Sequence, residues 1–257
     1  DVYRASNTSQ DANDNGGIAQ INNSFNQNLM SETYLTFSRT FNENHALTVM
    51  AGHSYNWDTG RGLYTTARGF VNDVLQNENM NAGNPNLRQI YNDGYYLSKL
   101  LSFYGRINYS LKDKYLLTAT MRADGSSKFP SDNRWGYFPS VSGAWRISEE
   151  PFMQDVKHII DGLKLRASYG TLGNQNLAGG DAASYYPTTQ NLAMGQISMN
   201  DNIYSLVTLN TLANPDIKWE TTTMLDVGVD FSLFNKLNIT ADWYRKETKD
   251  ILMKLDM

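Results

Sequence analysis

Strict alternation of apolar and polar residues limits most strongly how this chain can fold. Residues 117–124 read Leu-Thr-Ala-Thr-Met-Arg-Ala-Asp, with apolar side chains at the odd positions. The pattern recurs over 101–111, 163–169, 225–233 and 237–243. Successive side chains of a strand point to opposite faces, so each segment has one apolar and one polar face. The pattern predicts an all-β protein of eight or nine antiparallel strands, at about 17–28, 30–41, 45–57, 95–111, 115–124, 135–148, 161–172, 218–234 and 236–250. The first two are compatible with one long bent strand.

The connections between these strands alternate in length. Tight turns are expected at 41–45, 111–115 and 234–237, and long polar stretches at about 58–94, 125–134 and 173–216. Short turns at one rim and long loops at the other are typical of outer-membrane β-barrels. We also expect a short helix within 148–160 on the short-turn side and a helical turn at 70–77.

Composition narrows the classes of protein. The 257 residues contain no Cys, which excludes a disulfide framework and a thiolate metal site. The net charge of −4 does not indicate nucleic acid as a partner. No stretch approaches the roughly 20 apolar residues of a membrane helix. The chain opens on Asp1-Val2-Tyr3 without a Met or an apolar leader, so we expect both ends to lie inside a longer chain or to mark the limits of the part described.

Alternation by itself fits a soluble β-sandwich equally well. Aromatic residues, however, gather near the expected strand ends, as at Tyr109, Tyr115, Trp135 and Trp243. Transmembrane barrels place aromatic girdles at both membrane interfaces. Aromatic placement and loop asymmetry together favour the barrel.

The sequence contains no recognisable catalytic or metal-binding motif. Its three His residues are scattered, and no nucleophile–base or phosphate-loop pattern occurs. Residues 11–16 resemble the first half of an EF-hand loop, but the twelfth position is Asn22 instead of the bidentate Glu. We therefore expect no enzyme activity, no cofactor and no metal, and we interpret residues 11–22 as an ordinary polar loop.

Two stretches carry a resemblance to a known family. The first reads Arg-Ala-Asp-Gly-Ser-Ser-Lys-Phe-Pro at 122–130, Arg-Trp-Gly-Tyr-Phe-Pro-Ser at 134–140 and Leu-Lys-Leu-Arg-Ala-Ser-Tyr-Gly at 163–170. The second reads Ala-Asn-Pro-Asp-Ile-Lys-Trp-Glu-Thr at 213–221, Asp-Val-Gly-Val-Asp-Phe at 226–231 and Asp-Trp-Tyr at 242–244. These stretches resemble the SusC/RagA branch of TonB-dependent outer-membrane transporters of Bacteroidota.

The resemblance implies a 22-stranded barrel in the outer membrane of a Gram-negative bacterium, closed by a plug. It implies a SusD-like lipoprotein lid, energy from TonB–ExbB–ExbD through the plug, and an oligosaccharide or peptide substrate. Residues 1–257 would form part of the barrel domain, with plug, TonB box and C-terminal strands outside them. The alternative is a secreted or surface β-sandwich that binds carbohydrate.

Charged residues on the polar strand faces are candidates to face the barrel lumen, because lipid exposure near the midplane costs a few kcal/mol each. They are Arg106, Arg122, Asp124, Arg146, Lys164, Arg166, Asp226, Asp230 and Asp242. There they would pair with one another, contact the plug or touch substrate.

Residues 167–217 contain no Lys or Arg, but they contain Tyr185, Tyr186 and Tyr204. Tyr rings and amide side chains suit both sugar rings and peptide backbones. A loop that contacts the lid would have the same composition, so both interpretations stay open here.

Overall fold

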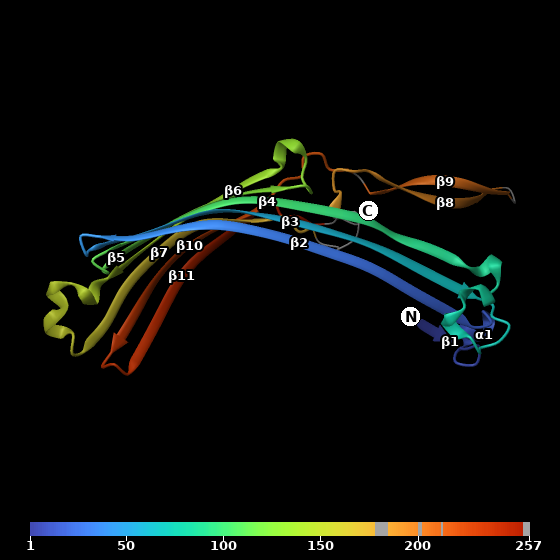
Figure 1. The fold of residues 1–257 in the computed structure, drawn as a ribbon, viewed down its shortest axis with the longest axis horizontal. Helices are drawn as coiled ribbons and strands as arrows, with labels where there is room; N and C mark the ends of the chain where they lie inside the picture. Colours follow the sequence, from blue (N-terminus) through green and yellow to red (C-terminus); the bar gives the residue numbers. More distant parts are fainter. Residues whose placement is uncertain (178–184, 200–201, 212, 254–257) are drawn as a thin grey trace. The chain divides into compact units, whose positions relative to one another are not determined.

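Long antiparallel strands dominate the computed structural model, which describes residues 1–177, 185–199, 202–211 and 213–253 (Figure 1). The strands are β1 (Val2–Arg4), β2 (Ile18–Phe41), β3 (His45–Arg68), β4 (Gln89–Leu111), β5 (Tyr115–Ser126), β6 (Trp135–Arg146), β7 (Ile160–Asn174), β8 (Asn191–Met199), β9 (Asn202–Thr211), β10 (Glu220–Leu233) and β11 (Leu237–Lys249). One nine-stranded sheet has the order β1-β2-β3-β4-β5-β6-β7-β10-β11, and β8 and β9 pair separately. The all-β, antiparallel prediction is confirmed. The first two expected strands form one strand, β2, so eight observed strands match expected segments, whereas β1, β8 and β9 were not expected.

Helical structure is confined to short segments. They are α1 (Gln10–Asp14), η1 (Gln76–Glu78), η2 (Met80–Ala82), η3 (Pro85–Leu87), η4 (Ser131–Asn133), η5 (Ile147–Glu149) and η6 (Pro151–Val156). The helix expected within 148–160 is present as the 3₁₀ segments η5 and η6, whereas the helical turn expected at 70–77 is wrong, because 3₁₀ geometry starts only at Gln76. Among the described residues, no helix has the length and apolar character needed to cross a membrane.

The chain divides into two compact units, residues 1–29 with 57–98, and residues 30–56 with 99–257. In the first unit, β1 pairs with the start of β2, and Ala19, Ala67 and Phe70 form a small buried cluster. The Thr59 hydroxyl, in β3, donates to the Tyr96 carbonyl of β4 over 2.8 Å. The polar loop expected at 58–94 is therefore shorter than predicted, because polar residues continue β3 and β4 as strands.

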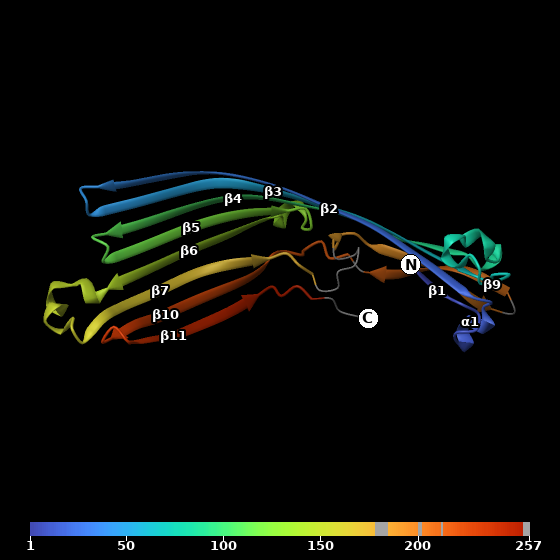
Figure 2. The same cartoon turned by 60° about the horizontal axis from the view of Figure 1, so that its bottom comes forward.

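In the second unit, β5, β6, β7, β10 and β11 lie side by side in antiparallel register (Figure 2). The three tight turns are confirmed, and each places two successive residues at positive φ: Asn42 and Glu43, Lys112 and Asp113, Phe234 and Asn235. In each turn the residue after this pair donates its N–H to the carbonyl three positions earlier. This is the type I′ geometry, whose twist matches that of the flanking strands.

The long-loop end of the second unit carries its own buried core. Phe129, Phe138, Ile217 and Trp219 form a cluster, and the partly buried Leu100, Leu177 and Leu252 pack against it. Trp219 also donates from Nε1 to the Arg134 carbonyl over 3.0 Å. Three residues of the stretches that carry the family resemblance, Phe129, Phe138 and Trp219, thus belong to this core.

Candidate functional site

Strand register places all nine charged candidates on one face of the sheet. Directly opposed residues of an antiparallel pair project to the same side. The pairs Ser102↔Asp124, Thr118↔Ser142 and Ser142↔Ser168 carry this face from β4 to β7, and Asp230↔Lys164 and Gly228↔Asp242 carry it to β11. The first register shift comes only at Ser232/Leu233. We call this side the charged face; it contains Arg106, Arg122, Asp124, Arg146, Lys164, Arg166, Asp226, Asp230 and Asp242.

The opposite side, which we call the apolar face, carries large side chains exposed to the surroundings. They include Leu117, Met121, Val141, Leu165, Tyr169, Val227 and Trp243. Between 43% and 60% of each of these residues stays exposed, so the described residues provide no core for this face to pack against.

Arg166 is the centre of an ion-pair network on the charged face. Its guanidinium reaches Asp242 at 2.6 Å, Asp230 at 3.3 Å and Asp226 at 3.5 Å, so three carboxylates from β10 and β11 converge on one residue of β7. Lys164 adds a second contact to Asp230 at 3.5 Å. The network contains two cations and three carboxylates, so its members satisfy most of one another's charge.

A glycine makes room for this network. A Cβ at Gly228 would contact the carboxylate of Asp242 and lie 2.7 Å from the Arg166 Cζ. Gly228 of β10 lies opposite Arg166 in the register. Because Gly228 has no side chain, the Arg166 guanidinium has room to lie across β10. In the sequence, the glycine is visible as the centre of the Asp-x-Gly-x-Asp spacing at 226–230. That Arg166 is its partner on the neighbouring strand follows only from the register.

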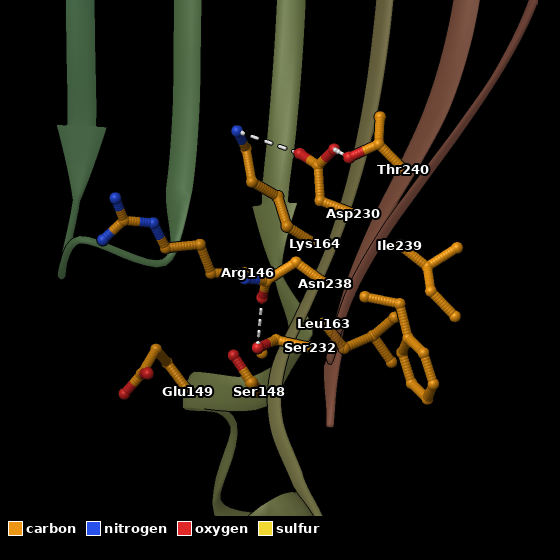
Figure 3. A pocket seen from close by; sticks show the side chains of 12 residues that line it. Arg146, Ser148, Glu149, Leu163, Lys164, Asp230, Ser232, Asn238, Ile239 and Thr240 are labelled. Atoms are coloured by element: carbon orange, nitrogen blue, oxygen red, sulfur yellow. Dashed lines mark hydrogen bonds and ion pairs between the residues drawn. The ribbon is translucent and has the colours of Figure 1, made fainter. Parts of the chain in front are cut away.

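A hollow of about 410 Å³ adjoins the network near the short-turn end of β7, β10 and β11 (Figure 3). Arg146, Glu149, Lys164 and Asp230 contribute its charged lining. Asp230 accepts a hydrogen bond from the Thr240 hydroxyl at 3.2 Å, and Ser232 donates to Asn238 at 2.7 Å. These groups bind one another and form no nucleophile–base pair. No group of His, Asp or Glu side chains in the described part of the chain could hold a metal ion.

A second polar chain crosses the charged face from β2 to β5. The Tyr104 hydroxyl donates to Glu32 over 2.6 Å, and the Arg122 guanidinium lies 5.8 Å from the Tyr104 ring centre. Arg122 also donates to Asp124 at 2.8 Å and to the Ser102 hydroxyl at 2.9 Å. Tyr104 and Glu32 were not expected from the sequence, because only the pairing of distant strands brings them to Arg122.

The remaining candidates differ in their surroundings. Arg106 and Arg146 have no acidic side chain within ion-pair distance in the described ranges. Tyr185 lies under the Lys128 ammonium group, 4.7 Å from its ring centre, and Tyr186 is half-buried. Tyr204, in β9, is exposed and pairs with Ile197 of β8. Part of the expected loop thus forms a hairpin, while residues 178–184, 200–201 and 212 lie outside the described residues.

Comparison with known proteins decides the family. The family model described as "TonB dependent receptor-like, beta-barrel" matches residues 1–256. This chain belongs to that family. TonB-dependent receptor P26 of Formosa agariphila is 36% identical over 93% of this chain and 23% of its own length. TonB-dependent receptor SusC of Bacteroides thetaiotaomicron is 43% identical over 60% of this chain and 15% of its own length.

Solved structures agree with the SusC/RagA type. The structure titled "Structure of the RagAB peptide transporter" superposes with a TM-score of 0.75 and 25% identity, covering 94% of this chain and 25% of that one. The chain spans about a quarter of the length of TonB-dependent receptor P26 and of the RagAB chain. As a TonB-dependent receptor barrel it belongs to an outer-membrane family that is not an enzyme class. The β-sandwich alternative is therefore wrong.

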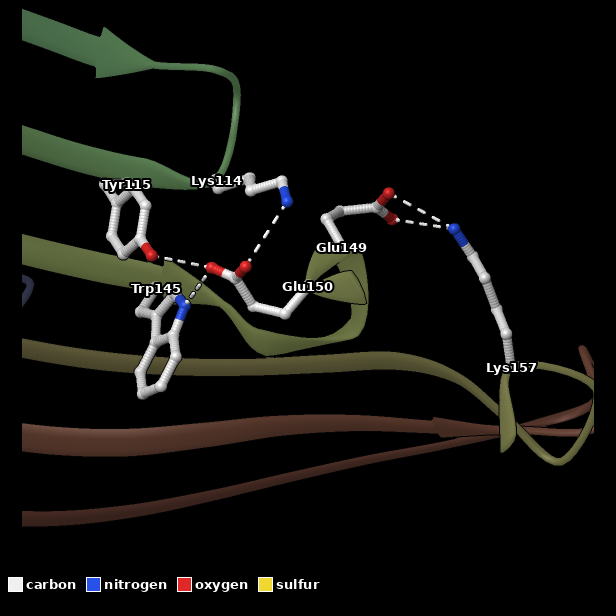
Figure 4. Close-up of polar contacts among 6 residues, drawn as sticks. All are labelled: Lys114, Tyr115, Trp145, Glu149, Glu150 and Lys157. Atoms are coloured by element: carbon white, nitrogen blue, oxygen red, sulfur yellow. Dashed lines mark hydrogen bonds and ion pairs between the residues drawn. The ribbon is translucent and has the colours of Figure 1, made fainter. Parts of the chain in front are cut away.

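The short-turn rim of this receptor barrel contains a polar cluster that the sequence did not reveal (Figure 4). Glu150 accepts hydrogen bonds from the Tyr115 hydroxyl at 2.7 Å and Trp145 Nε1 at 3.1 Å, and Lys114 Nζ lies 3.3 Å away. The Tyr115 bond, followed by those from Trp145 and Lys114, holds the pKa of Glu150 below its usual value, against the opposing effect of burial. Thirty-five residues separate Glu150 from Tyr115, so no local pattern indicates the contact.

Proposed function

We propose that this chain forms part of the wall of a TonB-dependent importer that takes an oligosaccharide or peptide across the outer membrane. The observation that carries the proposal is the two-sided sheet of a receptor-barrel family member, with nine charged residues on one face and unpacked apolar residues on the other. A sheet of this kind suits a wall between lipid and water.

The charged face then lines the lumen. A charged side chain turned to lipid at the bilayer midplane costs about 2–4 kcal/mol for Arg or Lys. Arg106, Arg122, Lys164 and Arg166 would together make the opposite orientation untenable. The Arg166 network is mainly structural in this proposal, because its members bind one another.

Arg106 and Arg146 are proposed contacts for the plug, which lies outside residues 1–257 together with the TonB box and the remaining strands. Both project from the charged face without an acidic partner within 4 Å in the described residues. Acidic plug residues would complete these pairs, and TonB–ExbB–ExbD would act on the barrel through the same plug.

The SusD-like lipoprotein is the proposed lid on the long-loop side, supported by the similarity to SusC and to the RagAB peptide transporter. Tyr185, Tyr186 and Tyr204 belong to the stretch without Lys or Arg on that side. We assign these residues to contacts with substrate or lid.

Uptake by the full-length protein in its own outer membrane tests the proposal. We expect deletion of the gene to abolish TonB-dependent accumulation of either a fluorescent oligopeptide mixture or a fluorescent oligosaccharide mixture, and plasmid-borne protein to restore it. The mixture affected identifies the substrate class. Unchanged accumulation of both mixtures would contradict an import function.

Orientation has a separate test. Labels on single Cys substitutions at Arg106, Arg122 and Arg166 should be shielded from a lipid-soluble quencher in the full-length protein. Labels at Met121 and Leu165, on the apolar face of the same strands, should be quenched. Efficient quenching at the Arg positions would show that the charged face meets lipid.

A further inference from the structure

The connection between β6 and β7 differs from the others at the same rim. The β2–β3, β4–β5 and β10–β11 connections are three-residue type I′ turns. The β6–β7 connection runs through residues 147–159 and contains η5 and η6. A tight turn suffices to join neighbouring antiparallel strands. The extra residues therefore serve something other than strand connection.

This connection is fixed to the apolar side of the sheet. Tyr115 and Trp145 are opposed in the β5–β6 register, on the same face as Leu117 and Leu165, and their rings stack 6.2 Å apart. Glu150 accepts hydrogen bonds from both side chains, as Figure 4 shows. Glu150 thus ties the connection to the aromatic rim of the apolar face.

An ion pair also holds the part of the connection that follows Glu150. Lys157 Nζ lies 3.2 Å from the Glu149 carboxylate, which links the two ends of η6. The Ile159 carbonyl accepts a hydrogen bond from the N–H of Phe234, in the β10–β11 turn. The connection is therefore a folded structure held at three points.

Between these points the connection presents apolar side chains outward. Phe152 is 65% exposed, and Val156 and Ile159 are also exposed. Phe234, which is exposed in the adjoining turn, extends the patch. The patch lies on the segment that Glu150 ties to the stacked rings of Tyr115 and Trp145, and Gln154, Lys157 and His158 are its polar neighbours in the sequence.

We propose that residues 150–159 form an interfacial anchor, with Phe152, Val156 and Ile159 entering the boundary between headgroups and acyl chains of the leaflet at the short-turn rim. The occupant is lipid, because Glu150 ties this segment to Tyr115 and Trp145 on the apolar face, which the proposed orientation turns to the membrane. Short segments with Phe on one side and Lys on the other settle in that layer. The anchor rests on the proposed orientation of the sheet, which has its own quenching test above, and not on the substrate, lid or plug.

Site-directed spin labels on the full-length protein test the anchor. The protein carries one introduced Cys at Phe152, Gln154 or Val156 and is placed in nanodiscs of phosphatidylethanolamine and phosphatidylglycerol. We expect the labels at 152 and 156 to be several-fold more accessible to oxygen than to a water-soluble nickel chelate. The label at 154 should show the reverse preference, and a label at Trp243, on the apolar face, gives the lipid reference.

Removing the Glu150 hydrogen bonds distinguishes a segment held in the membrane interface from one that is merely exposed. Glu150→Ala removes the acceptor that holds the connection to Tyr115 and Trp145, so the label at 152 should become at least about two-fold more accessible to the nickel chelate. Equal nickel access at 152 and 154 in the unaltered background would overturn the proposal. Low access to both reagents at 152 would also overturn it, because that result means that protein covers Phe152.

Discussion

The two ends of the sheet in the second unit use aromatic residues in opposite ways. At the long-loop end, Trp219 is 7% exposed and packs against Phe129 and Phe138, with ring centres 5.0 and 5.4 Å away. At the short-turn end, Tyr115 and Trp145 stack on each other and stay exposed. Both Trp indoles donate a hydrogen bond, Trp219 to a backbone carbonyl and Trp145 to Glu150.

The difference follows from the length of chain available at each end. Long loops can fold back and bury their aromatic residues, which gives the loop end a small core of its own. Three-residue turns leave no chain to cover an aromatic ring, and the longer β6–β7 connection supplies Glu150 as the partner for the polar edges of Tyr115 and Trp145. In the proposed orientation the membrane interface covers the exposed part of these rings. Aromatic residues thus form a buried core at one end and an exposed, hydrogen-bonded pair at the other.

Trp219→Ala should break the long-loop end with the largest effect. Removing a buried Trp from a packed cluster costs about 3–5 kcal/mol, and the Arg134 carbonyl also loses its donor. The full-length protein in detergent should show a clearly lower midpoint temperature by circular dichroism. Trp243→Ala is the matched control, because Trp243 is 60% exposed on the apolar face. Equal losses in both variants would contradict the buried-core description.

Face membership was the most predictable part of this molecule. The nine charged residues were assigned to one face from period-two alternation, and this holds because the register from β4 to β11 has no shift before Ser232/Leu233. A single inserted residue would have moved every later side chain to the other face. The tight turns were equally predictable from their short polar sequences between alternating segments.

The missed elements share a physical cause. Residues 58–68 and 89–94 form strand although their composition is that of a loop. Polar residues of 58–68 are buried there and find partners on the neighbouring strand: Thr59 and Thr66 are buried, and the Thr59 hydroxyl donates to the Tyr96 carbonyl. The β8–β9 hairpin lacks alternation, since apolar residues such as Met194 and Leu206 occupy opposite faces. Glu32 and Glu150 entered their clusters through contacts across 72 and 35 residues, respectively. Single-sequence patterns carry no information about such contacts.

Arg166→Ala should disrupt the charged face at the short-turn half of the sheet, with the second largest effect. Three carboxylates would lose their shared partner, although solvent screening reduces the loss because the Arg166 side chain is 29% exposed. The midpoint temperature should fall by less than in Trp219→Ala. Arg245→Ala is the control, since Arg245 has one long contact to Glu247 at 3.6 Å and is mostly exposed. A fall no larger than in this control would show that the network contributes nothing.

Gly228→Ala should disturb the same network more mildly. The new methyl group would contact Asp242 and Arg166, whose side-chain ends can shift, so the expected cost is about 1 kcal/mol. Gly143→Ala on β6 is the matched control, because its nearest contact is the Leu116 carbonyl at 3.8 Å. The midpoint temperatures of thermal unfolding of the two variants are compared. Equal losses would show that the space beside Gly228 is not needed by Asp242 and Arg166.

Glu150→Gln should change the short-turn end least, and it should do so in a pH-dependent way. The pKa of Glu150 lies below its ordinary value of 4.5, mainly because of the Tyr115 hydrogen bond, so its carboxylate stabilises the fold above that pH. The stabilisation is lost as the pH falls through the lowered pKa. We expect the midpoint temperatures of the full-length protein and of Glu150→Gln to differ at pH 7 and to converge as the pH drops below about 4. Glu149→Gln is the control, because Glu149 is half-exposed and its ion-pair partner among the described residues is Lys157, at 3.2 Å. A constant difference between Glu150→Gln and the unaltered protein from pH 7 to pH 3 would mean that the ionised carboxylate is not what holds the rim together.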